Sequence, residues 1–225
     1  MPFLITLGLI LLFALLFIPQ WWVKWVMKKY SSDRNDFPGT GAELAQHLLE
    51  KAGISNVKVE ETEQGDHYDP VDQAVRLSSG NFNGKSVTAI AIAAHETAHA
   101  IQHHHREKIF MTRLYLADII SKIEKIAYIL FMSVPVILIL LRSPLLVFIQ
   151  IIAGILLLSS RLFMHLFTLP VEFDASFRKA LPILMSGYLT NKDYRAARHV
   201  LLAAAFTYIA ATCANFLNFL RFLRR

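Results

Sequence analysis

Long apolar segments constrain the fold of this chain more than any other feature of its sequence. One covers residues 3–18, and two more cover residues 126–141 and 145–162. A helix that crosses a bilayer needs about 20 mostly apolar residues, because its backbone polar groups must be satisfied within the segment. Hydrophobic residues make up 55% of the chain and charged residues only 18%. The sequence therefore predicts a mainly α-helical membrane protein.

The first apolar segment is predicted to be an N-terminal membrane anchor. Trp21, Trp22 and Trp25 follow it, as is typical of the membrane interface, together with Lys24, Lys28 and Lys29. A cleaved signal peptide is the alternative, but no basic residue precedes the run and no small-residue cleavage site follows it. By the positive-inside rule, the lysines place the following loop on the cytoplasmic side.

The second and third apolar segments are predicted to form a transmembrane helical hairpin. Only Arg142-Ser143-Pro144 separates them, which is long enough for a tight turn and nothing more. A fourth apolar stretch, residues 200–220, is long enough to span the membrane but carries several Thr and Asn residues and ends in arginines. It is predicted to be a fourth span, and the alternative is an Ala-rich helix that packs against the other helices or lies in the membrane interface.

The net charge of +6 is concentrated downstream of the hairpin. The basic residues there are predicted to face cytoplasmic phospholipid; they are Arg178, Lys179, Lys192, Arg195 and Arg198. No aromatic-plus-basic surface motif accompanies them, so we expect no nucleic-acid partner. The single cysteine, Cys213, excludes an intramolecular disulfide.

One short motif carries the chemistry: His95-Glu96-Thr97-Ala98-His99, which has the form H-E-x-x-H. Side chains four residues apart lie on one face of a helix, so two neutral imidazoles can bind one Zn²⁺. Glu96 is rotated roughly 100° from the first histidine, where its carboxylate can take a proton from a zinc-bound water. The residues before His95 are apolar and Ala-rich, with Ser86 as the expected N-cap. A buried helix with these polar groups needs partners, and a metal supplies them.

About a hundred residues between the anchor and the hairpin are enough for a small α+β domain. A capping box at Thr40-Gly41-Ala42-Glu43 predicts a helix that ends at Gly53. Strands are predicted at residues 57–60 and 74–78, with a turn at residues 66–70 between them. Strands followed by an H-E-x-x-H helix are the usual layout of a zincin domain, in which a strand edge can dock an extended peptide.

A catalytic zinc site needs a third protein ligand and one position left open for water. His105 stands where a third histidine follows in H-E-x-x-H-x-x-G-x-x-H, but Gln102 replaces the glycine. On an uninterrupted helix His105 would lie roughly 15 Å along the axis from His95, so it could not reach the same metal. His103 shares the face of the motif and could lie next to its ligands. An intramembrane site would need an Asp-Gly motif, which the chain does not contain.

Glu172 is the favoured third ligand. Thr168 and Pro170 are predicted to begin a helix, and an acidic residue in a first turn ordinarily complements the helix dipole. A hairpin that crosses the membrane twice, however, returns Glu172 to the side of the H-E-x-x-H motif. Asp174 is the alternative ligand.

Longer motifs resemble the YugP-type neutral zinc metallopeptidases, a family of predicted multi-pass membrane proteins of bacteria. The likeness covers essentially the whole chain. It includes the Trp-rich anchor and residues 66–70, 75–78, 94–103 and 169–176. The family is more distantly similar to membrane peptidases with a Glu-x-x-x-Asp pattern, which implies Glu172 as the third ligand. Ser176 stands where that pattern has Asp, and Thr97-Ala98 departs from the glycine expected beside the second ligand.

We therefore expect a bacterial, multi-pass plasma-membrane zinc endopeptidase with its site on the cytoplasmic side. His95, His99 and Glu172 would hold Zn²⁺, Glu96 would be the catalytic base, and the substrate would be a peptide or membrane-protein segment. A non-enzymatic membrane protein with a structural zinc, and a hydrolase of small or lipidated substrates, are the alternatives. The predicted parts are the anchor (1–29), the zincin-like region (30–121), the hairpin (122–167), the third-ligand helix with a basic cytoplasmic segment (168–199) and the C-terminal apolar helix (200–225).

Overall fold

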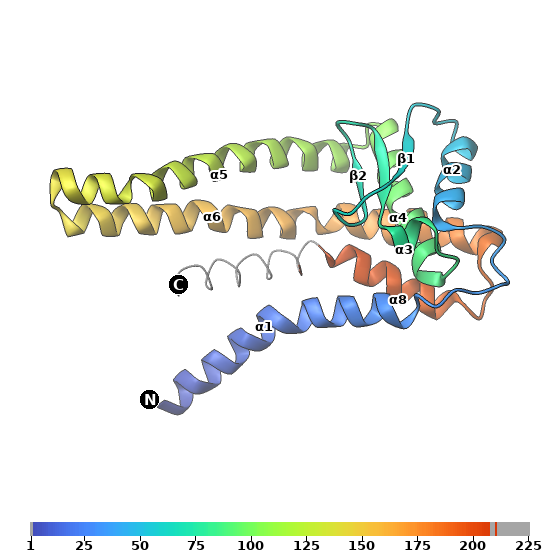
Figure 1. Ribbon diagram of the computed structural model, residues 1–225, viewed down its shortest axis with the longest axis horizontal. Helices are drawn as coiled ribbons and strands as arrows, with labels where there is room; N and C mark the ends of the chain where they lie inside the picture. The colour runs from blue at the N-terminus through green and yellow to red at the C-terminus, as the bar shows by residue number, and fades with distance from the viewer. Residues whose placement is uncertain (1, 208–209, 211–225) are drawn as a thin grey trace. The chain divides into compact units, whose positions relative to one another are not determined.

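A computed structural model describes residues 2–207 and residue 210 (Figure 1). The chain forms two compact units, one made of Met1–Phe110 with Leu169–Arg225 and the other of Met111–Thr168. Helices dominate both, and the first unit also contains a small three-stranded sheet. The predicted mainly α class with a small α+β part is therefore confirmed. Most of the predicted C-terminal helix, residues 200–225, lies outside the described residues.

The helix that carries the H-E-x-x-H motif lies at the centre of the first unit. This helix, α4 (Val87–His104), has fifteen of its eighteen residues buried. Ser86 caps it as predicted, because the Ala89 N–H donates to Ser86 Oγ at 3.1 Å. Helix α4 packs against α2 (Gly41–Lys51), α8 (Tyr194–Ala205) and the sheet. Its many alanines let these neighbours approach its backbone closely.

Helix α2 begins with the predicted capping box. Thr40 N–H donates to Glu43 Oε2 at 2.8 Å, and Glu43 N–H donates to Thr40 Oγ1 at 3.3 Å. Gly41, the first residue of α2, lies where this helix meets α3 (Ser79–Phe82). A Cβ atom there would lie 2.2 Å from the Asn81 carbonyl oxygen, so a side chain would force the two helices apart.

The sheet has the order β1-β3-β2, formed by β1 (Lys58–Glu61), β2 (His67–Asp69) and β3 (Ala74–Leu77). Strand β1 runs parallel to β3, and β2 runs antiparallel to it. The predicted turn at residues 66–70 is wrong, because this segment contains β2. Only Tyr68 of the three β2 residues is buried, and Pro70 follows at once, so the alternation is too short to be recognised in the sequence.

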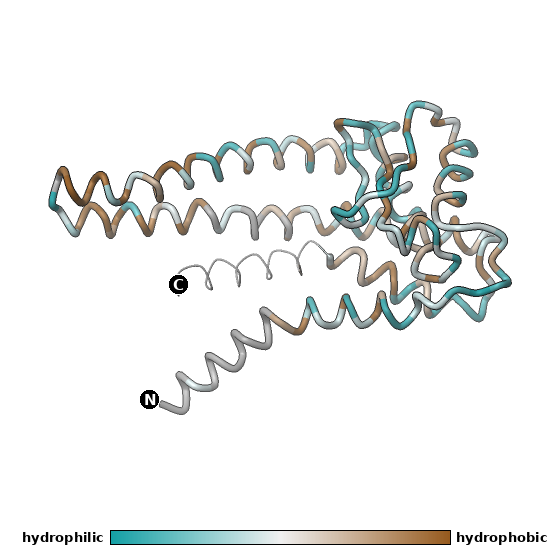
Figure 2. The backbone as a smooth tube through the Cα atoms, viewed as in Figure 1, coloured by the Kyte–Doolittle hydropathy of each residue, from teal (hydrophilic) through white to brown (hydrophobic). Residues whose placement is uncertain are grey.

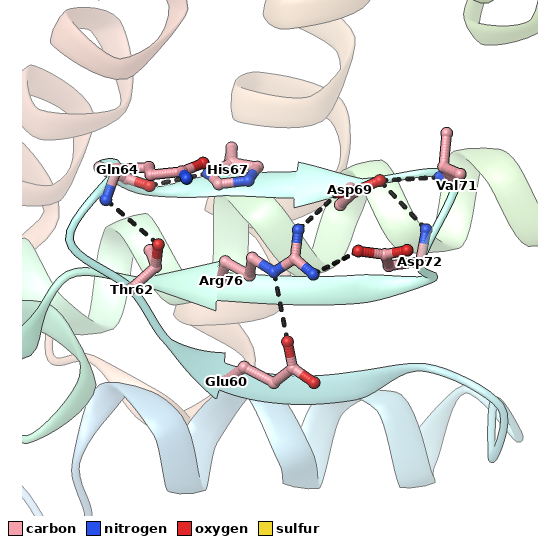
Figure 3. A network of polar contacts seen from close by, with 9 residues as sticks. Glu60, Thr62, Gln64, His67, Asp69, Val71, Asp72 and Arg76 are labelled. Atoms are coloured by element: carbon pink, nitrogen blue, oxygen red, sulfur yellow. Dashed lines mark hydrogen bonds and ion pairs between the residues drawn. The ribbon is translucent and has the colours of Figure 1, made fainter.

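Arg76 of β3 ties the three strands together (Figure 3). Its guanidinium donates to Asp69 Oδ2 and Asp72 Oδ2, both at 2.5 Å, and to Glu60 Oε2 of β1 at 3.2 Å. Burial alone would raise the pKa of Asp69, but hydrogen bonds from the Val71 and Asp72 N–H groups and from Arg76 hold it below its ordinary value. This network stabilises the short sheet that packs against α4.

The second unit contains most of two long helices, α5 (Lys108–Leu141) and α6 (Pro144–Phe173), which run antiparallel (Figure 1). Gln150 Nε2 of α6 donates to Leu130 O and to Ser133 Oγ of α5, each at 2.6 Å. These bonds join the two helices in the half of the unit that is nearer the turn.

Many large apolar side chains of this unit are exposed, for example Ile139 at 72% and Leu156 at 67%. Figure 2 shows the strongest hydrophobic colouring near the turn between the two helices. Among the described residues, one helical stretch is long and apolar enough to cross a membrane, Lys108–Leu140, and Pro144–Leu157 is a shorter apolar helix. The number of membrane crossings stays a prediction.

The expected helix start near Thr168 and Pro170 is wrong. Helix α6 continues through Pro170 and passes directly into the π-helix η1 (Asp174–Ala180), followed by α7 (Leu181–Ile183) and the π-helix η2 (Leu184–Tyr188). Pro170 removes one backbone donor, but Val171 and Glu172 directly after it are both only 1% exposed. Their packing in the first unit outweighs the local preference. Within that unit, α1 (Pro2–Lys29) lies alongside α8 (Figure 1).

Candidate metal centre

Three potential metal ligands converge in the first unit, two from α4 and one from the end of α6. His95 Nε2 lies 3.3 Å from Glu172 Oε2, and His99 Nε2 lies 3.2 Å from the same oxygen. All three ligand atoms lie within 4.8 Å of one another. The residues are 2%, 2% and 1% exposed. The structure thus brings His95, His99 and Glu172 together, as the sequence predicted.

This geometry fits a zinc ion. Two ligands each about 2.1 Å from a tetrahedral Zn²⁺ lie about 3.4 Å apart, close to the two nitrogen–oxygen separations given above. Two imidazoles and one carboxylate are also a usual ligand set for a catalytic zinc, which keeps a fourth position for water. The buried His95, His99 and Glu172 side chains can therefore bind a metal ion.

The far side of the His95 ring contacts a hydroxyl group. His95 Nδ1 lies 3.1 Å from Ser176 Oγ of η1, and this hydroxyl also donates to the Leu201 carbonyl of α8 at 3.0 Å. Ser176 is fully buried. It occupies the position at which the more distantly similar peptidases have the aspartate of their Glu-x-x-x-Asp pattern.

The far side of the His99 ring contacts an amide. His99 Nδ1 lies 2.8 Å from Gln102 Oε1, and Gln102 Nε2 donates to Asp174 Oδ2 at 2.8 Å. The same Nε2 lies 3.4 Å from the Val171 carbonyl oxygen. Asp174, the alternative ligand in the sequence analysis, is therefore placed behind Gln102 and outside the cluster of three ligands.

Lys179 is the last member of the hydrogen-bond chain that runs from His99 through Gln102 and Asp174. Lys179 forms ion pairs with Asp174 and, at 3.0 Å, with Glu107 Oε2. Burial would raise the pKa of Asp174, but hydrogen bonds from Lys179 and Gln102 hold it below its ordinary value. Burial would likewise lower the pKa of Lys179, but its two carboxylate partners raise it. The prediction that Lys179 faces phospholipid is wrong, because its side chain is only 19% exposed and is paired within the protein.

Glu96 lies on α4 between the two histidines and is 7% exposed. A carboxylate at this position follows the first ligand by one residue, as the H-E-x-x-H motif requires for a general base.

The other histidines of α4 lie apart from the ligand cluster. His103 Nδ1 lies 2.9 Å from the Tyr68 hydroxyl of β2, and both rings contact Phe110. Burial raises the pKa of Tyr68 to about 12, with the Asp69 charge adding to the effect, so its hydroxyl stays protonated and can donate to His103. His105 is the exposed C-cap residue of α4, in agreement with its exclusion as a ligand.

The chain resembles known proteins over nearly its whole length. Residues 5–225 match the model of a family described as "Putative neutral zinc metallopeptidase". The chain belongs to this zinc metallopeptidase family. It is also 36% identical over 213 residues, 93% of this chain and 91% of the other, to "Putative membrane protease YugP" of Bacillus subtilis (strain 168). No solved structure gives a significant match. Membership of this family and the buried ligand cluster together identify zinc as the cofactor.

Sequence reasoning did not place Gln102 or Lys179 behind the histidines, and it named Ser176 only as the replacement of an aspartate. Gln102 was considered only as the replacement of a glycine, although three residues after His99 it lies on a neighbouring face of the same helix. Ser176 contacts His95 of α4, and Lys179 contacts Glu107. In both pairs the two residues are more than 70 positions apart in sequence. No local pattern could have indicated these contacts.

Proposed function

We propose that this chain is a membrane-anchored zinc metallopeptidase that cleaves peptide bonds with Glu96 as its general base. The buried convergence of His95, His99 and Glu172 around a metal-sized site supports this proposal most directly. Membership of a zinc metallopeptidase family supports the same class of reaction.

The ligand set suits hydrolysis. When bound, zinc acts as a Lewis acid toward the scissile carbonyl and the attacking water. Two neutral imidazoles and one carboxylate leave a divalent ion with a net charge of about +1, which preserves this electrophilic character. Glu96 would take the proton from the attacking water and return it to the nitrogen of the leaving amine.

The sheet offers a place for an extended peptide. Strand β2 is an outer strand beside α4, and no further strand pairs with it in residues 2–207. A peptide laid along β2 could form main-chain hydrogen bonds while its scissile bond approaches the metal helix. Peptides or segments of membrane proteins are therefore the proposed substrates, and nucleic acid is not a proposed partner.

The membrane attachment is proposed to be multi-pass, with α1 as the anchor and α5 and α6 as a transmembrane hairpin. Trp21 is 66% exposed and Trp25 is 46% exposed, with Lys29 Nζ lying 4.6 Å from the Trp25 ring centroid, an arrangement suited to a lipid interface. The apolar surface of the second unit would be covered by lipid. Lys28 and Lys29 in the last turn of α1 support a cytoplasmic site. The name of the Bacillus subtilis relative also refers to a membrane protease.

The experiment that tests this function compares wild type with Glu96→Gln, purified in detergent. Zinc content and hydrolysis of a quenched fluorescent peptide library are measured for both. The substitution keeps the shape of the side chain but removes the base, so we expect full zinc content and a 10²–10⁴-fold lower turnover.

Glu50→Gln is the matched control, because Glu50 is an exposed glutamate on α2 far in sequence from the motif. It should retain full activity. If Glu96→Gln cleaved peptides as fast as wild type, the proposed role of Glu96 would be overturned. If neither the wild type nor any variant hydrolysed peptides although zinc was bound, the structural-zinc alternative would replace the peptidase proposal.

A further inference from the structure

We propose that Gln102 is a positioning residue that fixes His99 in its metal-binding tautomer, through a hydrogen-bond chain that continues to Asp174 and Lys179. This inference rests on the metal site of the proposed function. Gln102 is fully buried, and its side chain bonds to His99, Asp174 and the Val171 carbonyl instead of belonging to the cluster of three ligands.

The orientation of the Gln102 amide is determined by its neighbours. Its Nε2 faces the Asp174 carboxylate at 2.8 Å and the Val171 carbonyl at 3.4 Å. Both groups are acceptors only, because the Asp174 carboxylate is held in an ion pair by Lys179. The NH₂ end must therefore point toward them. A flipped amide would place its oxygen against a carboxylate oxygen and would remove one of the donors of that carboxylate, leaving Lys179 as its remaining part-buried partner.

The orientation of the amide in turn determines the tautomer of His99. Gln102 Oε1, which lies 2.8 Å from His99 Nδ1, can only accept. Nδ1 must therefore carry the proton, and Nε2 then presents its lone pair toward Glu172 at 3.2 Å. A neutral imidazole protonated on Nδ1 is the form that binds a metal through Nε2.

His95 is held in the same tautomer by an independent contact. The Ser176 hydroxyl donates to the Leu201 carbonyl, so its lone pair is left to accept from His95 Nδ1 at 3.1 Å. Both Nε2 lone pairs thus converge on the same carboxylate oxygen of Glu172. Behind each histidine lies a neutral group, the Ser176 hydroxyl or the Gln102 amide. Each of these groups donates in turn to a fixed acceptor, the Leu201 carbonyl or the Asp174 carboxylate.

The chain behind His99 also joins segments far apart in sequence. Lys179 of η1 contacts both Asp174 and Glu107, and Glu107 follows the end of α4. This pairing holds the end of the metal helix against the π-helix that follows Glu172. The spacing between the two histidines on α4 and Glu172 therefore depends on Asp174 and Lys179, which also belong to the hydrogen-bond chain that orients Gln102.

Zinc affinity, measured by competition with a chromophoric chelator on purified protein in detergent, tests the inference. Gln102→Leu removes the acceptor while filling a similar volume, and we expect zinc affinity to fall 10–100-fold. Gln102→Glu keeps an acceptor for His99 but faces the Asp174 carboxylate, so it should also bind zinc more weakly than wild type.

Combining Gln102→Glu with Asp174→Asn provides the rescue. The side-chain amide introduced at position 174 can then donate to the carboxylate introduced at position 102, in place of the wild-type bond from Gln102 to Asp174. His99 Nδ1 again faces a fixed acceptor. We expect this double variant to recover most of the zinc affinity that Gln102→Glu loses. Such a recovery would show that the affinity lost in Gln102→Glu comes from its contact with residue 174 and not from the mere presence of a substitution at position 102.

Gln150→Leu is the matched control, since Gln150 is a buried glutamine of the second unit with two hydrogen bonds of its own. Its zinc affinity should equal that of wild type. Wild-type zinc affinity in Gln102→Leu would overturn the inference and leave the peptidase proposal intact, as would a double variant no better than Gln102→Glu. If wild type itself bound no zinc, the metal site of the proposed function would fail first.

Discussion

At the scale of single residues, the burial of His95, His99 and Glu172 costs free energy of hydration unless a metal is bound. A carboxylate with 1% exposure loses nearly all of its hydration, and such a group is stable only when it is paired or coordinated. A bound Zn²⁺ compensates this charge and the polar imidazole nitrogens together. Because the site forms only in the folded chain, part of the metal-binding free energy is also folding free energy.

The ion pair between Arg34 and Asp193 contributes to the dependence of stability on pH. Asp193 accepts from Arg34 Nη1 at 2.5 Å and from Thr190 Oγ1 at 2.8 Å. Burial would raise the pKa of Asp193, but these hydrogen bonds outweigh it and lower the pKa below its ordinary value. A lowered folded-state pKa stabilises the protein above the unfolded-state value, about pH 4, and that contribution is lost as the pH falls through the folded-state pKa.

We therefore expect Asp193→Asn to lower the free energy of unfolding by about 1–2 kcal/mol at pH 7, with a discount because Arg34 is partly exposed. The difference between variant and wild type should shrink as the pH falls below about 4. Thermal unfolding in detergent across this pH range is the measurement. Asp118→Asn, which removes an exposed pair with Lys122, is the control and should change stability little at any pH. A constant Asp193→Asn deficit down to pH 2 would contradict the prediction.

At the scale of elements, the π-helix η1 is what completes the site. Its seven residues, Asp174–Ala180, begin two positions after Glu172 and are wound more widely than an α-helix. Ser176 of η1 reaches His95, and Lys179 of η1 reaches Glu107. Isolated π-helical turns are commonly found at functional sites. Here the irregular segment brings two supporting side chains to the metal helix.

The elements also show what a sequence can predict. The capping box at Thr40 and the N-cap at Ser86 are local signals with local causes, and both are present as predicted. Strand β2 was missed because only one of its three residues is buried. The continuation of α6 through Pro170 and the π-winding of η1 depend on packing between residues far apart in the chain, which no local propensity encodes.

The candidate site divides in the same way. The spacing of His95, Glu96 and His99 indicates a metal helix without further information, because helix periodicity alone brings the side chains together. Glu172, 73 residues after His99, could be predicted only from the expected hairpin and the family resemblance. Gln102 was visible in the sequence, but its role required knowledge of Asp174 behind it.

At the scale of the whole molecule, the proposed topology places the site and the hairpin turn on opposite sides of the membrane. The apolar side chains of α5 and α6 are exposed within their own unit, as lipid-facing side chains would be. Two crossings by these helices would return the chain after α6 to the cytoplasmic side, where Glu172 joins α4.

Cysteine labelling in intact cells tests this topology. Single cysteines are introduced as Val71→Cys, at an 88% exposed position next to β2, and as Arg142→Cys, at the exposed hairpin turn, each in a Cys213→Ser background. A membrane-impermeant maleimide should label Arg142→Cys in intact cells and Val71→Cys only after permeabilisation. The Cys213→Ser parent should stay unlabelled. Labelling of both positions from the same side would contradict a hairpin that crosses twice.

The most direct test of the central claim is the zinc stoichiometry and zinc-edge X-ray absorption of the purified protein, compared between wild type and Glu172→Ala. We expect one zinc per wild-type chain, with two imidazole nitrogens and at least one carboxylate oxygen at about 2.0–2.2 Å. Glu172→Ala should lose stoichiometric zinc, whereas Glu60→Ala, which removes a partner of Arg76 on the sheet, should keep it. An unchanged zinc content and ligand shell in Glu172→Ala would contradict the assignment of this residue as the third ligand.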